Sequence, residues 1–162
     1  MARKKIIKLI LNEYAGPEEL SDEDQKLLIE AMHAGSHAYS PYSDFPVGAA
    51  LRLDTGEIIR GNNRENASFP VSICAEHTAV ACAGANYPES VITTIAICAR
   101  KGKDFTDMPV SPCGKCRQVL SEEEDRAGRK IRVILYGKSR IYVIDGIENL
   151  LPLRFSSSAL RT

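Results

Sequence analysis

The sequence predicts a layered α/β fold, because segments with the pattern of strands alternate with segments with the pattern of helices along the chain. Two stretches illustrate the alternation. Residues 91–99, VITTIAICA, are rich in β-branched residues and lie between polar residues, which is typical of a strand. The Ala-rich stretch from Cys74 to about Ala85 is typical of a helix. At 162 residues the chain is long enough to form one domain with its own core.

The first part of the chain predicts an added strand and then a helix. Residues 5–14, KIIKLILNEY, could form a strand or a helical turn, and we favour a strand. Ser21 is the expected N-cap of the helix, with Asp24 three residues on. The apolar residues between 27 and 34 recur at helical spacing, so the helix should continue until the SHAYSPYS stretch.

The remaining elements follow from alternation and turn residues. Residues 47–61, VGAALRLDTGEIIRG, predict a hairpin, because Asp-Thr-Gly interrupts two apolar runs. A second helix-like stretch begins at Cys113 and continues through SEEED. Two further strands are expected at 131–137 and 141–145, and a short C-terminal helix around 147–152.

Composition narrows the classes of function. Lys plus Arg and Asp plus Glu both number 21, so the chain shows none of the basic excess of a nucleic-acid binder. No stretch approaches the roughly 20 apolar residues of a membrane span. The basic and apolar start is interrupted at Lys8, which argues against a signal peptide. We therefore expect a cytoplasmic protein that binds neither nucleic acid nor membrane, with an N-terminal extension at 1–20 and one domain at 21–162.

Three of the five cysteines predict a metal site. Cys113 and Cys116 are in C-x-x-C spacing on the first turn of their helix, and Cys74 begins another helix. Helix N-termini favour thiolates, and three thiolates can hold Zn²⁺. No fourth Cys or His follows at ligand spacing, so one position stays open, which is the catalytic arrangement. Cys82 and Cys98 are expected to be buried thiols.

Glu76 is the expected proton carrier beside that metal. It follows Cys74 by two residues, so on a helix the two side chains do not ligate one ion from the same face. A carboxylate over the open position suits proton transfer from water better than ligation. A first ligand two residues before a glutamate, followed by P-C-x-x-C, also matches the signature of zinc nucleobase deaminases.

From about Ser21 to Phe155 the chain resembles the small homotetrameric zinc-dependent cytidine deaminases. The resemblance implies a three-layer α/β/α fold with a central mixed sheet of about five strands. It also implies one Zn²⁺ per chain and a homotetramer with shared active sites. It rests on five blocks in the expected order, which are AYSPYSDFPVGAAL, GNNRENASFP, CAEHTA, SPCGKCRQVL and LLPLRF.

The implied reaction is hydrolytic deamination of cytidine and 2′-deoxycytidine to uridine and 2′-deoxyuridine, with release of ammonia, in pyrimidine salvage. Zinc would activate a water for attack at C4, with Glu76 as the proton shuttle. By position, the resemblance assigns zinc binding to Cys74, Cys113 and Cys116. It assigns ribose binding to Asn63 and Glu65, pyrimidine packing to Phe45, and base-edge contacts to the backbone around Ala75 and Ser111. It also implies that Phe155 and the backbone near Ala67 contact a neighbouring subunit's site.

His77 departs from the family pattern, which usually has arginine after the glutamate. Such an arginine donates hydrogen bonds to the zinc thiolates and offsets their charge. We expect His77 to donate to a thiolate in its place. The alternative is that His77 points away and that another cation, with Arg117 the nearest candidate in sequence, supplies the compensation.

Three other functions are compatible with parts of this pattern. A structural zinc module would have a fourth protein ligand and a dispensable Glu76. A polynucleotide-editing deaminase would need a basic groove and commonly has histidine as first ligand, where this chain has Cys74. A deaminase of another cytosine compound, such as a nucleoside antibiotic, is the closest rival. The NRENA stretch, residues 63–67, favours an ordinary nucleoside.

Overall fold

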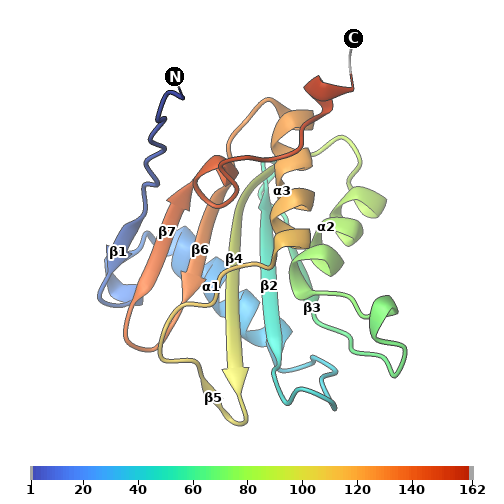
Figure 1. Cartoon of the computed structure of the whole chain (residues 1–162). Helices are drawn as coiled ribbons and strands as arrows, with labels where there is room; N and C mark the ends of the chain where they lie inside the picture. The colour runs from blue at the N-terminus through green and yellow to red at the C-terminus, as the bar shows by residue number, and fades with distance from the viewer. Residues whose placement is uncertain (1, 161–162) are drawn as a thin grey trace.

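A mixed sheet lies between one helix on one face and two helices on the other in the computed structural model, which describes residues 2–160 (Figure 1). This three-layer arrangement confirms the predicted fold class. The helices are α1 (Asp22–Gly35), α2 (Ala75–Asn86) and α3 (Gly114–Ala127), and the strands are β1 (Asn12–Tyr14), β2 (Val47–Leu53), β3 (Ile58–Asn62), β4 (Ile92–Lys101), β5 (Asp104–Phe105), β6 (Arg132–Tyr136) and β7 (Ile141–Asp145).

The sheet has seven strands, where the sequence predicts about five. Its order is β1-β7-β6-β4-β2-β3, with β5 paired to β4. Only β4 and β6 run parallel, and the other pairs are antiparallel, so the sheet is mixed as expected. The five strands predicted from residue 47 onward are all present. Of the other two, β1 is shorter than the N-terminal strand predicted within residues 5–14, and the two-residue β5 was not predicted.

Local sequence explains how the elements begin and turn. The Ser21 hydroxyl accepts a hydrogen bond from the N–H of Asp24 at 3.3 Å, which caps α1 as predicted. Gly56 in the β2–β3 turn has φ +96°, a left-handed conformation that glycine adopts without steric cost. The expected C-terminal helix is a single 3₁₀ turn, Ile147–Asn149.

Two apolar cores lie on the two faces of the sheet. Strand β4 serves both, because successive side chains of a strand point to opposite faces. Ile95 and Ile97 pack into the core beneath α2 and α3, whereas Ala96 and Cys98 pack against α1. Cys98 is therefore the buried thiol that the sequence predicts. Cys82 is exposed on α2, so the prediction for that thiol is wrong.

No helix among residues 2–160 combines the length and the apolar character needed to cross a membrane.

The contact between α1 and β2 generates a test of the packing. A Cβ atom added to Gly48 would lie 2.0 Å from the carbonyl oxygen of Ala31 and 2.4 Å from the amide nitrogen of Gly35, so α1 would have to move. We expect Gly48→Ala to lower the free energy of unfolding by about 1–3 kcal/mol, measured by urea denaturation.

Gly84→Ala on α2 is the matched control. A Cβ at this position meets nothing within 4 Å, and alanine is the better helix former by about 1 kcal/mol. Gly84→Ala should thus leave stability unchanged or raise it. Equal unfolding midpoints for the two variants would contradict the close α1–β2 contact.

Candidate active site

The three predicted metal ligands converge at the N-termini of α2 and α3. Cys74 is the N-cap of α2, Cys113 is the N-cap of α3, and Cys116 lies on the first turn of α3. The Sγ atoms of Cys74 and Cys113 are 3.8 Å apart, and those of Cys113 and Cys116 are 3.6 Å apart. All three lie within 4.8 Å of one another. Residues 39 positions apart in sequence therefore form one cluster.

Local hydrogen bonds fix the two helix starts. The Thr78 hydroxyl donates to the carbonyl oxygen of Cys74 at 3.0 Å. On α3, the Nε of Arg117 donates to the carbonyl oxygen of Pro112 at 2.8 Å, and its guanidinium also donates to the carbonyl of Leu150 at 2.7 Å. These contacts tie the segments that carry the cysteines to the rest of the fold.

The cluster has the chemistry of a zinc site. The hydrogen bond from Cys116 lowers the pKa of Cys74 to about 6, and the same contact raises the pKa of Cys116. Burial instead raises the pKa of the isolated Cys98 thiol to about 12. Three thiolates this close require a cation, and three sulfur ligands with one open position suit Zn²⁺. The residues present therefore fit one zinc ion per chain.

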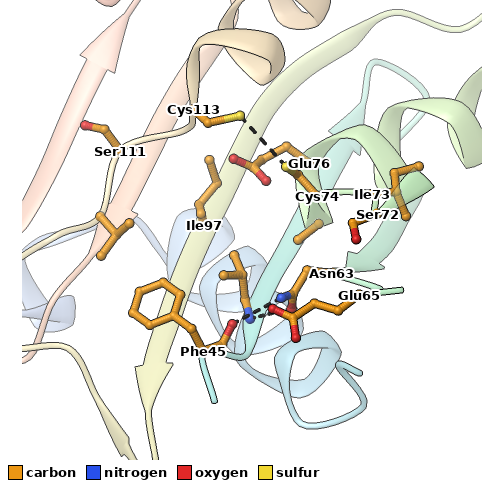
Figure 2. Close-up of a pocket in the computed structure, with 13 residues that line it drawn as sticks. Phe45, Asn63, Glu65, Ser72, Ile73, Cys74, Glu76, Ile97, Ser111 and Cys113 are labelled. Atoms are coloured by element: carbon orange, nitrogen blue, oxygen red, sulfur yellow. Dashed lines mark hydrogen bonds between the residues drawn. The ribbon is translucent and has the colours of Figure 1, made fainter. Parts of the chain in front are cut away.

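Glu76 lies on the first turn of α2 and is only 5% exposed. It lines the same cavity as Cys74 and Cys113, and Figure 2 shows its carboxylate beside these two cysteines. Burial raises the pKa of this carboxyl group above its ordinary value. A carboxyl group held dry beside a metal site is placed to accept and return a proton.

The cavity has a volume of about 290 Å³ and a mostly apolar lining. Five of the residues to which the resemblance assigns substrate contacts line it, namely Phe45, Asn63, Glu65, Ala75 and Ser111 (Figure 2). Ala67 and Phe155 are exposed and do not line the cavity of their own chain. The carbonyl oxygen of Phe155 accepts a hydrogen bond from Gln118 of α3 at 2.8 Å.

Asn63 holds the start of β2 at the cavity wall. Its Oδ1 accepts from the N–H of Val47 at 2.8 Å, and its Nδ2 donates to the carbonyl of Phe45 at 3.1 Å (Figure 2). The side chain thereby fixes the segment that carries the aromatic ring. The second Nδ2 hydrogen stays available to a ligand.

Glu65 holds the turn before Phe45 in a similar way. Its Oε2 accepts from the N–H groups of Tyr42 and Ser43 at 2.8 and 3.2 Å, and its Oε1 accepts from the Ser43 hydroxyl. The bond from the Ser43 side chain lowers the pKa of Glu65, so the group is a carboxylate at neutral pH. Because a carboxylate offers about four acceptor sites, Oε1 retains capacity for a ligand hydroxyl.

Five further residues line the cavity that the sequence argument did not select: Val47, Ser72, Ile73, Ile97 and Val110. Four of them lie one or two positions from a selected residue in the sequence, and that proximity was the available signal. Ile97 comes from the middle of β4, and its apolar side chain looks the same in sequence whether it faces a core or a cavity.

His77 is half-buried, and its Nδ1 is buried without a hydrogen-bond partner. Among the described residues no hydrogen bond joins His77 to a cysteine sulfur, so its tuning of the thiolates stays a prediction. Arg117, the alternative cation, donates to the backbone carbonyls of Pro112 and Leu150. Its described hydrogen bonds therefore go to the chain rather than to sulfur.

Comparison with known proteins bears out the resemblance. The family model described as the cytidine and deoxycytidylate deaminase zinc-binding region matches residues 21–128. A cytidine deaminase of Halalkalibacterium halodurans is 47% identical over 98 residues, which cover 60% of this chain and 70% of the relative. A blasticidin-S deaminase of Bacillus cereus is 34% identical over 140 residues, which cover 85% of this chain and 95% of the relative.

Solved structures agree with this assignment. The crystal structure of a cytidine deaminase from Burkholderia pseudomallei matches with a TM-score of 0.69 at 36% identity, covering 80% of this chain and 97% of that one. That of a cytidine deaminase from Mycobacterium tuberculosis matches with a TM-score of 0.64 at 32% identity, covering 84% and 98%.

The cysteine cluster predicts that the purified chain holds about one zinc ion. Cys113→Ser should weaken zinc binding by more than the roughly 10–100-fold that loss of an outer-shell partner costs, measured by competition with a chelator. Cys82→Ser, which replaces an exposed thiol on α2, should leave zinc affinity unchanged. Equal affinities for the two variants would show that Cys113 is not a ligand.

Proposed function

The chain belongs to the cytidine and deoxycytidylate deaminase family and is a zinc-binding deaminase, and we propose that it converts cytidine and 2′-deoxycytidine to uridine and 2′-deoxyuridine with release of ammonia. The main support is the position of Glu76, a buried carboxyl group in the same cavity as the cysteine cluster. A structural zinc module has no need of a carboxyl group at this place.

The proposed mechanism is a hydrolysis in which Glu76 moves protons between water and the base. Cys74, Cys113 and Cys116 would hold a zinc ion, which would act as a Lewis acid and make a water molecule more acidic. Glu76 accepts a proton from that water and passes it to N3 of the pyrimidine while the new C4–O bond forms. Glu76 then moves the remaining proton from the new C4 hydroxyl group to the amino group, so that the C4–N bond breaks, the C4 carbonyl forms and ammonia leaves.

The cavity walls support a nucleoside as the substrate. Phe45 supplies an aromatic surface for the pyrimidine, and the backbone around Ala75 and Ser111 supplies hydrogen-bonding groups for the base edge. Asn63 and Glu65 face the same cavity, each with one hydrogen-bonding position left over, and we assign them to the 3′-hydroxyl of the ribose.

The same resemblance supports a homotetramer with shared active sites. Phe155 and Ala67 lie outside the cavity of their own chain and are exposed, which leaves them free to contact a neighbouring subunit. We place the reaction in pyrimidine salvage in the cytoplasm. Neither Cys82 nor Cys98, the two cysteines outside the proposed zinc site, forms a disulfide.

A second candidate substrate is the nucleoside antibiotic blasticidin S. The relative from Bacillus cereus that is named for this activity matches over 95% of its own length. Assays with cytidine, 2′-deoxycytidine and blasticidin S in parallel, followed by the change in ultraviolet absorbance, separate the candidates. If the protein turned over blasticidin S and neither cytidine nor 2′-deoxycytidine, blasticidin S would replace these two nucleosides as the proposed substrate.

Replacing Glu76 by glutamine tests the proton-shuttle role. Glutamine keeps the shape of the side chain and cannot carry the proton, so we expect kcat on cytidine to fall by about 10²–10⁴-fold or more. Because Glu76 is not assigned as a ligand, the variant should retain its zinc, measured by elemental analysis.

Glu122→Gln is the matched control, because Glu122 is an exposed carboxylate on α3 away from the cavity. Its kcat should equal that of the parent protein. Near-parental kcat in Glu76→Gln would refute the shuttle assignment, and loss of zinc from that variant would make Glu76 a ligand.

A further inference from the structure

Residues 2–11, here called the N-terminal arm, continue from the edge strand β1 and run away from the sheet (Figure 1). The arm exposes five large apolar side chains, from 49% for Ile7 and Leu11 to 73% for Ile6. Strand β1 is the last strand of the sheet on its side, so its outer edge has no paired strand within residues 2–160. Such an apolar edge is a template for pairing with another chain.

One hydrogen bond indicates which backbone groups of the arm face β7 and which face the free edge. Ile10 donates its N–H to the Oδ1 of Asn149 at 3.1 Å, on the side of β1 that faces β7. Backbone groups of a strand alternate between its two edges. Residues 2–11 form no strand in the single chain, and an extension of β1 through them would turn the N–H and C=O groups of Leu9 and Leu11 toward the free edge.

The side chains also alternate. In a strand extended to residue 5, positions 5, 7, 9, 11 and 13 would share one face, and in sequence they are Lys, Ile, Leu, Leu and Glu. This face is an apolar stripe with a cation at one end and an anion at the other. A stripe of this kind is complementary to an antiparallel copy of itself.

We propose that residues 5–13 pair antiparallel with the same segment of a second copy of this chain, with Leu9 opposite Leu9 of the partner subunit. In this register Ile7 lies opposite Leu11 of the partner subunit, and Lys5 lies opposite Glu13 of the partner subunit. Each of these contacts occurs twice by symmetry. Apolar and opposite-charge cross-strand pairs each stabilise a sheet, by about 0.2–1 kcal/mol.

The neighbouring symmetric register is less favourable. Moving the axis by one residue would place Lys8 opposite Lys8 of the partner subunit, and like charges directly opposite destabilise a strand pair. Glu13 also accepts hydrogen bonds from Arg140 at 3.1 and 3.2 Å, and a carboxylate has further acceptor positions for a lysine. The other neighbouring register, centred on Ile10, would place Ile7 opposite Glu13 of the partner subunit and lose the Lys5–Glu13 pairs, so charge favours the register centred on Leu9.

The contact stands independently of the proposed activity, since it lies at the β1 edge and contains no residue of the cavity. A pair of nine-residue strands buries less than the roughly 1,200 Å² of a standard stable interface. We expect it to act together with other contacts between copies. A cross-linking experiment is therefore a sharper test than oligomeric state.

The test places single cysteines in the arm of the full-length, zinc-loaded protein that also carries Cys82→Ser. In Leu9→Cys, the two new cysteines lie directly opposite, with Cα atoms about 5.5 Å apart, within the range of a disulfide. In Ile6→Cys, the new cysteine lies opposite Asn12 of the partner subunit, so the two thiols are about 20 Å apart. After mild oxidation, non-reducing electrophoresis should show at least tenfold more covalent dimer for Leu9→Cys.

The absence of a Leu9→Cys dimer, or equal dimer from both variants, would overturn the proposal. Both positions are exposed, so both variants should keep the thermal midpoint of the parent, which confirms that they fold. The basic, apolar arm also has the composition of a membrane-binding segment. Retention on phosphatidylglycerol vesicles without a specific Leu9→Cys dimer would assign the arm to a membrane surface and overturn pairing between copies.

Discussion

The site depends on one electrostatic constraint, which is that three sulfur atoms lie within 4.8 Å of one another. As thiolates they repel, so a divalent cation and the partial positive charge of two helix N-termini have to offset that repulsion. Two helices on the same face of the sheet must therefore begin at the same place. Cys74 and Cys113 meet this requirement as the N-caps of α2 and α3. Glu76 is the second residue of α2, and this position brings its side chain into the cavity.

The cavity walls show how a few polar side chains do two tasks. Asn63 and Glu65 hold the segment from Tyr42 to Val47 by hydrogen bonds to its backbone, and so fix the ring of Phe45 at the cavity. Each keeps one hydrogen-bonding position for a ligand. Under the proposed function, positioning of the wall and recognition of the sugar would therefore be coupled, and a change in either residue should disturb both.

The sequence was sufficient for features set by local pattern or by ligand chemistry. The five strands from residue 47 onward, the three helices, the Ser21 cap and the cysteine cluster were all predicted. Three kinds of feature were not predictable. A two-residue strand such as β5 carries no periodicity, the exposure of Cys82 depends on which face of α2 packs on the sheet, and Ile97 has the same apolar character whether it lines a cavity or a core. The hydrogen bonds of Glu65 to a turn more than 20 residues away are likewise tertiary.

X-ray absorption at the zinc edge of the purified protein is the sharpest test of an open three-cysteine zinc site, because it counts the atoms bound to the metal. A site made by Cys74, Cys113 and Cys116 with one open position should give three sulfur atoms at about 2.3 Å and one lighter atom at about 2.0 Å. That result is expected for a catalytic zinc beside Glu76. Four sulfur atoms, or an added histidine nitrogen in place of the light solvent atom, would show a closed structural site and rule out a catalytic zinc.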